Sequence, residues 1–248
     1  MPTRDWNNQV WSGDYDWKDK GEEWSTVWGG SEAHWYGSLF PRLHRFLPAD
    51  RVLEIAPGFG RWSKFLIPTS TDYFGIDLSA ECVAGCSKIF ERFDHAKFFQ
   101  NDGLSLAAAP NDHFDLIFSY DSLVHAEIEV IRTYVGQSLG KLAVDGVAFF
   151  HHSNLSAVRD SVGTAYSHHR SESVSAELVA DAVQAARGKV LLQEVINWGD
   201  TDVLLDGFTL FARAEAPWTP HPSAIKNANY MQEANNIRLN QSPWCVAR

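Results

Sequence analysis

Short apolar runs alternate with amphipathic stretches along most of this chain of 248 residues. The apolar, β-rich runs predict strands over residues 51–55, 72–77, 95–102, 113–121, 146–152, 189–197 and 206–212. Apolar positions at helical spacing predict helices over residues 32–47, 61–66, 79–93, 122–142 and 175–186. The link 198–205 is too short for a parallel return, so the last two strands should pair antiparallel. The pattern predicts an α/β fold with a seven-stranded, mostly parallel sheet and a C-terminal antiparallel pair.

The two ends of the chain depart from this pattern. Six of the ten tryptophans lie in the first 35 residues, mixed with Asp and Gly. We expect residues 1–31 to form an aromatic arm, whose rings either pack on the body or form a lid that faces a bound ligand. Residues 32–215 should form the main domain, and residues 216–248 an extension that is punctuated by proline and then polar.

Charge and cysteine content narrow the class of partner. Lys and Arg number 21 against 31 Asp and Glu, a formal net charge of −10, which disfavours nucleic acid as a partner. The three cysteines form no CxxC pair, which is typical of a reducing compartment. Because the sequence has no leader pattern and no membrane-spanning apolar run, we expect a cytoplasmic protein that does not contact a membrane. The sequence leaves open whether the protein forms a homo-oligomer.

A glycine turn, Ala56-Pro57-Gly58-Phe59-Gly60, joins the first strand to its helix. Such a turn lets the backbone approach a ligand closely, and here it favours a cofactor that carries adenosine. The phosphate-binding Walker pattern is absent, because Arg61 and Trp62 follow Gly60. The dinucleotide pattern lacks its third glycine, where Ser63 stands. Both departures disfavour a bound pyrophosphate.

From about residue 32 to 213 the chain resembles the class I S-adenosylmethionine-dependent methyltransferases, which have a Rossmann-like fold. The resemblance is carried by LEIAPGFG (53–60), Asp77, Asn101-Asp102-Gly103 and the antiparallel pair. It implies that the glycine turn lies under the methionine portion of S-adenosyl-L-methionine, that Asp77 takes both ribose hydroxyls, and that Asp102 meets the adenine amino group. Ala56 stands where the family usually has glycine. The implied cofactor site comprises Tyr36, Glu54, Ala56, Gly58, Gly60, Asp77, Leu78, Asn101, Asp102, Gly103, Ser119 and Tyr120.

Three further stretches are similar to sugar O-methyltransferases of bacterial polysaccharide and natural-product pathways: GGSEAHWYG (29–37), DSLVHAE (121–127) and FFHHSNL (149–155). Within that group, the resemblance suggests the mycobacterial mannoside methyltransferases of methylmannose polysaccharide synthesis. The resemblance implies a small-molecule or oligosaccharide substrate whose hydroxyl is methylated. A phenol or carboxylate acceptor in the same fold is an alternative. So is a nicotinamide-linked oxidoreductase, or a binding module without catalysis, that uses the same glycine turn.

The candidate catalytic residues follow the fourth strand. Ligands of parallel sheets sit beyond the carboxyl ends of the strands, and a sugar hydroxyl must lose its proton as it is methylated. His125 lies four residues after Asp121, so the two side chains would converge on one hydroxyl if the helix has begun. We predict His125 as the general base, oriented or charge-stabilised by Asp121. A histidine bonded to backbone and an aspartate that caps the helix are the alternatives.

Some sugar methyltransferases that resemble this chain bind a divalent cation such as Mg²⁺ through acids after strands four and five. The matching positions here are Asp121, His151 and His152, a set poor in the oxygen ligands that Mg²⁺ prefers. Successive strand residues point to opposite faces, so only one of the two histidines should enter the pocket. The predicted substrate contacts are Trp28, His152, His169 and Arg170, although the segment 168–170 could be a solvated loop.

Overall fold

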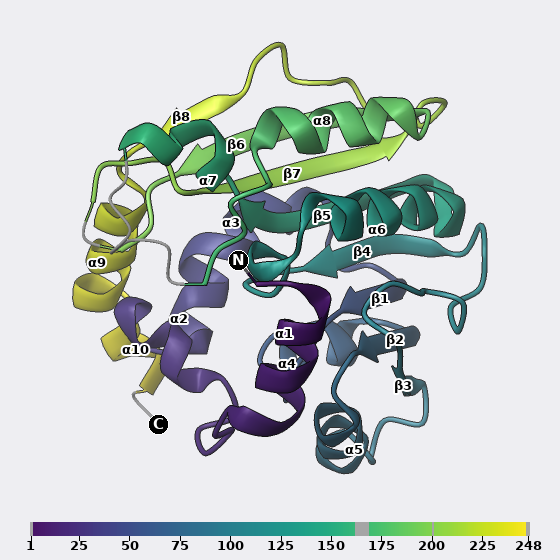
Figure 1. Ribbon diagram of the computed structural model, residues 1–248. Coiled ribbons are helices and arrows are strands. Elements are labelled where there is room, and N and C mark those ends of the chain that lie inside the picture. Colours follow the sequence, from purple (N-terminus) through teal and green to yellow (C-terminus); the bar gives the residue numbers. More distant parts are fainter. Residues whose placement is uncertain (1, 162–168, 200, 247–248) are drawn as a thin grey trace.

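The computed structural model describes residues 2–161, 169–199 and 201–246, and its central feature is one mixed β-sheet. Within these ranges the strands are β1 (Arg51–Ile55), β2 (Asp72–Asp77), β3 (Ala96–Gln100), β4 (Phe114–Ser119), β5 (Leu142–Ser153), β6 (Gly188–Ile196), β7 (Asp206–Arg213) and β8 (Ile225–Asn227). Their order is β3-β2-β1-β4-β5-β7-β6-β8 (Figure 1). β1 to β5 pair in parallel, whereas β7 is antiparallel to both β5 and β6. The predicted α/β fold with a mostly parallel sheet and an antiparallel pair is therefore confirmed, whereas the predicted number of strands is not.

The sheet has eight strands in the described part of the chain, one more than predicted. β8 pairs in parallel with the end of β6, where Ile225 lies opposite Glu194 and Asn227 opposite Ile196. The Asn227 side chain also donates a hydrogen bond to a Glu194 carboxylate oxygen (2.7 Å). Three residues in a polar, proline-rich tail are too short a run to show strand periodicity, which is why the sequence did not predict β8.

Helices lie before, between and after the strands. The α-helices are α1 (Arg4–Gln9), α2 (Ser31–His34), α3 (Phe40–Leu43), α4 (Ser63–Leu66), α5 (Ala80–Ile89), α6 (Ile128–Lys141), α7 (Leu155–Val158), α8 (Ala176–Ala185), α9 (Tyr230–Asn240) and α10 (Ser242–Val246). Short 3-10 helices cover Glu22–Trp28, His44–Phe46, Ile67–Thr69, Leu123–His125 and Arg159–Ser161, and wide π-type turns cover Val10–Asp14 and Trp35–Leu39.

Two predicted helices are interrupted. The first is divided into α2, a wide turn, α3 and a 3-10 turn; Pro41 within it has no N–H to donate to the preceding turn. The second begins only at Ile128, because Ala126 is extended (φ −91°, ψ 138°) and separates α6 from the 3-10 turn Leu123–His125. This break lies at the predicted catalytic residues and changes how they face one another.

Alternate residues of the strands enter two apolar layers, one on each face of the sheet. On β4, Leu116 and Phe118 pack into one layer and Ile117 into the other. The first layer contains residues of α2, α4, α5 and α9, among them Tyr230, together with Trp62 just before α4. The second contains residues of α6 and α8, which cover the other face (Figure 1). Helices on both faces of a largely parallel sheet leave the carboxyl ends of its strands as the place for a ligand.

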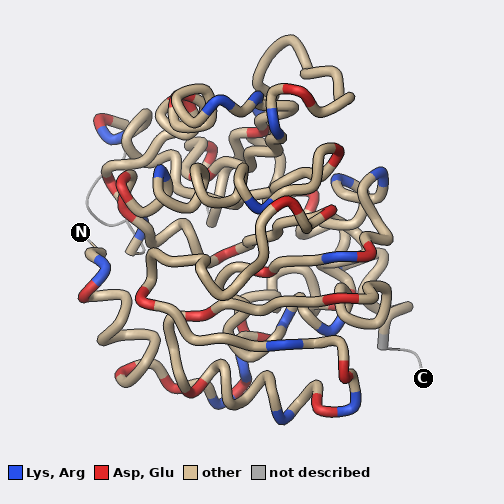
Figure 2. Tube along the Cα trace, turned by 90° about the vertical axis from the view of Figure 1, so that its right-hand side faces the viewer, with Lys and Arg blue, Asp and Glu red and all other residues tan. Residues whose placement is uncertain are grey.

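Basic residues are dispersed among acidic ones on the side of the molecule shown in Figure 2, where no long basic segment is drawn. Among the described residues, no helix combines the length and the apolar character needed to cross a bilayer.

Candidate functional site

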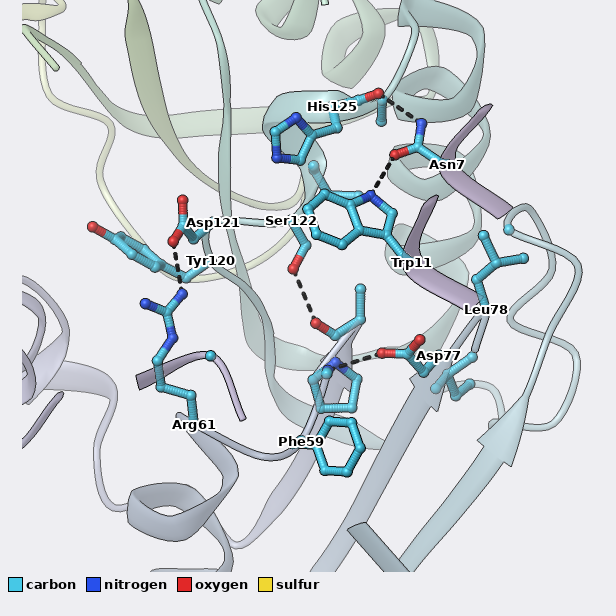
Figure 3. Close-up of a pocket in the computed structure, with 18 of the residues that line it drawn as sticks. Asn7, Trp11, Phe59, Arg61, Asp77, Leu78, Tyr120, Asp121, Ser122 and His125 are labelled. Carbon is cyan, nitrogen blue, oxygen red and sulfur yellow. Dashed lines mark hydrogen bonds and ion pairs between the residues drawn. The ribbon is translucent and has the colours of Figure 1, made fainter. Parts of the chain in front are cut away.

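A cavity lies at the carboxyl ends of β1, β2 and β4, between the sheet and the N-terminal arm (Figure 3). The sheet side contributes residues 56–59 of the glycine turn, Asp77 and Leu78, Asn101, Gly103, and the segment from Tyr120 to Ala126 without Val124. Gly60, a predicted cofactor contact, is not part of this lining. The arm contributes Arg4, Asn7, Trp11, Trp17, Lys20, Gly21 and Trp24. The sequence left open whether the aromatic rings of the arm face a ligand or pack on the body. In the structure the arm covers the cavity, and its rings also pack on one another and on Phe59 of the glycine turn.

The glycine turn has the backbone shape that a close ligand needs. Ala56, Gly58 and Gly60 all have positive φ, at 56°, 59° and 84°. A Cβ at Gly60 would lie 2.4 Å from the ring of Phe90, so only glycine fits there. Ala56 holds a conformation that favours glycine; its N–H donates to Ile76 (2.7 Å) and its carbonyl accepts from the Ser122 hydroxyl (3.0 Å). The alanine at the family's glycine position therefore keeps the turn at the expense of some strain.

Asp77 ends β2 beside this turn. One carboxylate oxygen accepts from the Gly58 N–H (2.9 Å) and the other from the Ser79 N–H (2.8 Å). Burial raises the pKa of the Asp77 carboxyl. A carboxylate offers about four acceptor positions, so each oxygen can still accept from a ligand hydroxyl. Asp77 thus lies in the cavity lining beside the glycine turn, and its hydrogen bond to Gly58 helps to fix the turn.

Asp102 lies outside the cavity lining, unlike its neighbours Asn101 and Gly103. Its exposed carboxylate accepts from the N–H groups of Ser105 (2.8 Å) and Leu104 (3.0 Å), which hold its pKa below the usual range. The Asp102 carboxylate is therefore bound by its own loop and does not line the cavity, contrary to the prediction. Asn101 faces the cavity and donates to the Tyr134 hydroxyl (3.1 Å).

Three other predicted cofactor contacts are corrected by the structure. Tyr36 is exposed and packs against Phe40 and Phe65, away from the cavity lining. Glu54 is buried and accepts from Tyr73 (2.5 Å) and Ser63 (2.7 Å) on the layer beneath the turn. The Ser119 hydroxyl donates to the Ile55 carbonyl (3.0 Å). Glu54 and Ser119 thus link neighbouring strands, Glu54 joining β1 to β2 and Ser119 joining β4 to β1. Tyr120 and Leu78 do line the cavity.

His125 is in the cavity lining, held from two sides. Its Nδ1 donates to the His169 carbonyl (2.8 Å), and its own carbonyl accepts from the Asn7 side chain (2.9 Å). The Trp11 ring lies 5.3 Å from the imidazole ring, centroid to centroid. Burial lowers the pKa of His125 to about 4, so the ring is neutral at pH 7. With the proton on Nδ1, the lone pair of Nε2 is available as an acceptor.

Asp121 does not pair with His125 in the described structure, contrary to the prediction. Its carboxylate accepts from Arg61 Nη2 (2.7 Å), and its N–H donates to His151 Nδ1 (3.1 Å). Asp121 has a left-handed backbone (φ 64°), and the helix begins only at Ile128, so the two residues do not share a helical face. The prediction assumed that a helix had already begun at residue 122.

The predicted metal ligands do not converge either. His151 bonds Asp206 (3.2 Å) through Nε2, whereas His152 bonds Thr209 Oγ1 (2.7 Å) and the Ser153 carbonyl (2.9 Å). Both rings are buried with both nitrogens engaged. No group of three or more His, Cys, Asp or Glu residues among those described is arranged to hold a metal ion.

The predicted substrate contacts lie mostly outside the cavity. Arg170 is buried in a two-bond ion pair with Asp206 (2.6 and 2.7 Å), and the ring of Trp28 is buried in a stack on His34, with centroids 3.6 Å apart. His152 is internal, as described above. His169 contacts the site through its carbonyl, and its ring lies 5.0 Å from Trp6. His168 lies outside the described residues.

Several residues of the cavity were not singled out from the sequence. Arg61 follows Gly60 directly, and its position in the turn is a signal that could have found it. Asn7 and Trp11 are four residues apart, so they share a helical face of the arm. Outside the cavity lining, Asp206 was also missed: it begins the strand that pairs with β5, and only the fold brings it to His151.

Comparisons with known proteins identify a domain and a fold that this chain shares with others. Residues 52–146 match the family model described as a methyltransferase domain. The fold is similar to that of the N-methyltransferase NodS from Bradyrhizobium japonicum WM9 in complex with S-adenosyl-L-homocysteine (19% identity, 85% of this chain and 98% of that chain, TM-score 0.59). It is also similar to an S-adenosylmethionine-dependent methyltransferase from Clostridium acetobutylicum ATCC 824 (16% identity, 83% and 95%, TM-score 0.58). A third similar structure is PH0226 from Pyrococcus horikoshii OT3 (15% identity, 82% and 94%, TM-score 0.58).

No functionally curated protein gives a significant match. At these identities the structural neighbours show a shared fold, and the domain match adds the activity. The alternatives of a nicotinamide-linked oxidoreductase and of a binding module without catalysis are therefore set aside. The chain is an S-adenosylmethionine-dependent methyltransferase.

Proposed function

We propose that this enzyme methylates a hydroxyl group of a small carbohydrate, a mannoside or a related sugar, with His125 as the general base. The observation that carries the proposal is the state of the His125 ring: its pKa of about 4 keeps it neutral, and its Nδ1–H is held by the His169 carbonyl. A neutral imidazole with a free Nε2 lone pair can accept the proton that a hydroxyl loses when its oxygen is methylated. S-adenosylmethionine supplies the activated methyl group when it is bound.

The residues around the cavity fit this cofactor. Asp77 would accept from the ribose hydroxyls, while the bare backbone at Gly58 leaves room for the methionine portion. Leu78 and Tyr134 offer apolar surface to a purine ring, and Asn101 offers polar groups. These roles are supported by the positions of the residues and by the family resemblance.

The aromatic wall of the arm supports a ring-shaped acceptor with an apolar face. Trp11, Trp17 and Trp24 line the cavity and contact one another, with ring centroids 5.6–6.1 Å apart. Indole faces are rigid, largely apolar surfaces that also tolerate polar neighbours. A sugar ring presents C–H groups to such a wall and hydroxyls at its rim. The sequence resemblance to sugar O-methyltransferases points in the same direction.

The test is an acceptor screen with purified enzyme and S-adenosylmethionine. Release of S-adenosylhomocysteine would be followed with methyl α-mannoside, a mannose oligosaccharide, a phenol, a carboxylate and a primary amine, and the product position would be assigned by NMR. We expect turnover with a mannose-containing acceptor and an O-methyl product. Turnover confined to the phenol, the carboxylate or the amine would overturn the carbohydrate assignment.

A further inference from the structure

The proton of the His125 ring is placed by a backbone carbonyl. Nδ1 of His125 lies 2.8 Å from the carbonyl oxygen of His169. Because a carbonyl can only accept, this contact keeps the proton on Nδ1 and leaves Nε2 as the acceptor. The proposed function needs this tautomer, since Nε2 is the atom that would take the proton of the hydroxyl. Whatever fixes the His169 carbonyl therefore decides which ring nitrogen can act as a base.

Residues 169–171 run beside Val124 and His125. The His125 ring contacts one end of this segment, and at the other end the Ser171 N–H donates to the Val124 carbonyl (2.9 Å). His169 has a left-handed backbone (φ 58°). Such a conformation is unfavourable for a residue other than glycine and persists only where the surroundings hold it. The Ser171 bond holds one end of the segment, whereas the strained residue lies at the other.

Arg170 anchors the segment between these two residues. Its side chain is only 4% exposed, and its Nε and Nη2 donate to the two carboxylate oxygens of Asp206 (2.6 and 2.7 Å). The guanidinium also lies over the Trp198 ring (5.2 Å). Two parallel bonds fix the orientation of a guanidinium as well as its position. They also restrict the peptide group that joins His169 to Arg170, and the oxygen of that peptide is the one that meets His125.

Asp206 is itself held at the start of β7. Its side chain is fully buried, and it accepts a third bond from His151 Nε2 (3.2 Å). The His151 proton is on this nitrogen, because Nδ1 accepts from the Asp121 N–H (3.1 Å). Although burial alone would raise it, Arg170 and His151 hold the pKa of Asp206 well below the usual range. The carboxylate is therefore ionised at neutral pH and keeps all three bonds.

The ion pair between Arg170 and Asp206 lies behind the cavity wall. Neither residue is part of the cavity lining, so neither contacts a ligand bound there. A buried ion pair is also weak evidence of a purely stabilising role, because taking two charges out of water is unfavourable. The pair has one direct link to the cavity, which runs through the His169 carbonyl to the His125 ring.

We propose that Arg170 and Asp206 are positioning residues for the base: their ion pair holds the His169 carbonyl against His125 Nδ1 and so keeps Nε2 as the proton acceptor. The inference rests on His125 as the base of the proposed function. Loss of either partner lets the peptide turn away, and the proton then moves to Nε2, which removes the acceptor. The pair acts on the tautomer of the ring and not on the affinity for the cofactor.

The experiment locates the proton on His125 by NMR of the imidazole nitrogens, in full-length enzyme with isotope-labelled histidine at neutral pH. The His125 signals are assigned by their absence from His125→Ala. The variants are Arg170→Met and Asp206→Asn. Arg42→Met is the matched control, because Arg42 makes a two-bond ion pair with Glu194 and neither residue lines the cavity. On the same proteins, kcat is measured with methyl α-mannoside and binding of S-adenosylhomocysteine by calorimetry.

We expect the proton on Nδ1 in the wild type and in Arg42→Met. In Arg170→Met and Asp206→Asn a population with the proton on Nε2 should appear, and kcat should fall by about 10- to 100-fold, up to the cost of a misplaced reacting group. Binding of S-adenosylhomocysteine should stay within about 2-fold of wild type in both variants, because the cofactor is not touched. A general loss of structure would weaken this binding as well.

A proton that stays on Nδ1 in both variants, or that lies on Nε2 in the wild type, would overturn the inference, as would equal changes in Arg42→Met. If Arg170→Met does not fold, Asp206→Asn decides, because it keeps the size of the side chain but removes its charge and one acceptor oxygen.

Failure of the proposed function gives a different result. If the proton moves to Nε2 and kcat does not change, the pair does position the ring, but His125 is not the base. If the wild type does not turn over methyl α-mannoside, the carbohydrate assignment is contradicted, and the NMR result alone still decides whether the pair positions the ring.

Discussion

The side chain of Asn7 donates a hydrogen bond to the backbone carbonyl of His125, a residue 118 positions further along the chain. The same side chain accepts from the Trp11 indole N–H (2.9 Å). The proposed base is therefore tied to the arm that covers the cavity (Figure 3). Docking of the arm and placement of the base are linked through one amide.

This link predicts the effect of Asn7→Ala. Loss of a hydrogen bond between neutral groups should weaken arm docking by about 0.5–1.5 kcal/mol. We expect kcat/KM to fall by about 3- to 10-fold and dissociation of S-adenosylhomocysteine to speed up, measured by stopped-flow tryptophan fluorescence. Asn8→Ala is the matched control, because Asn8 is exposed and bonds only within the arm in the described structure. Equal effects of the two variants would contradict the link.

His125→Ala should lower kcat by about 10²-fold or more, the usual contribution of a general base. Binding of S-adenosylhomocysteine should stay within about 2-fold of wild type, because His125 is assigned to the acceptor. Since the pKa of His125 is about 4, kcat should lose activity on the acid side only when the pH approaches that value. A fully active His125→Ala enzyme would assign the base elsewhere.

Glu54→Gln tests a buried carboxyl. Burial raises the pKa of Glu54 to about 7 from 4.5. Below pH 4.5 the Glu54 carboxyl is protonated in both the folded and the unfolded protein. As the pH rises toward 7, the unfolded chain releases this proton while the folded protein keeps it, so the free energy of unfolding of the wild type falls. The neutral glutamine avoids this loss. The stability difference between Glu54→Gln and wild type should therefore grow between pH 4.5 and 7, by about 3 kcal/mol at most, and then level off. Urea unfolding at several pH values measures it, and a difference independent of pH would refute the shift.

Arg42→Met tests the attachment of the C-terminal segment. Arg42 bonds both Glu194 of β6 (2.8 Å) and Glu233 of α9 (2.7 Å) in a largely buried cluster. Its removal leaves buried carboxylates without a partner, and the free energy of unfolding should drop by about 3 kcal/mol. Arg51→Met, which breaks the more exposed pair with Asp115, should cost less than about 1 kcal/mol. Similar losses in urea unfolding would show that the cluster has no special role.

The sequence alone predicted those features of the structure that depend on hydrophobic periodicity and on the residues of local turns. Apolar strands that are buried on both faces, the glycine turn and Asp77 lie where their neighbours in the sequence predicted. The metal-binding and substrate-binding roles predicted for His151, His152 and Arg170 were wrong. These side chains bond instead to Asp206 and Thr209, which lie on a strand more than 30 residues further along the chain. The sequence alone does not show which polar side chains find partners inside the protein. The sequence did not predict that the helix is interrupted at Ala126, because alanine favours helices and does not indicate a helix end.

The short strand β8 has a consequence for handling the protein. It covers the end of β6 from Glu194 to Ile196, a segment that would otherwise form an open margin of the sheet. Unpaired backbone groups at such a margin can recruit a strand from another molecule. A protein truncated near residue 213 would lack β8 and would expose this edge of β6. We expect the truncated protein to self-associate and not to be monodisperse.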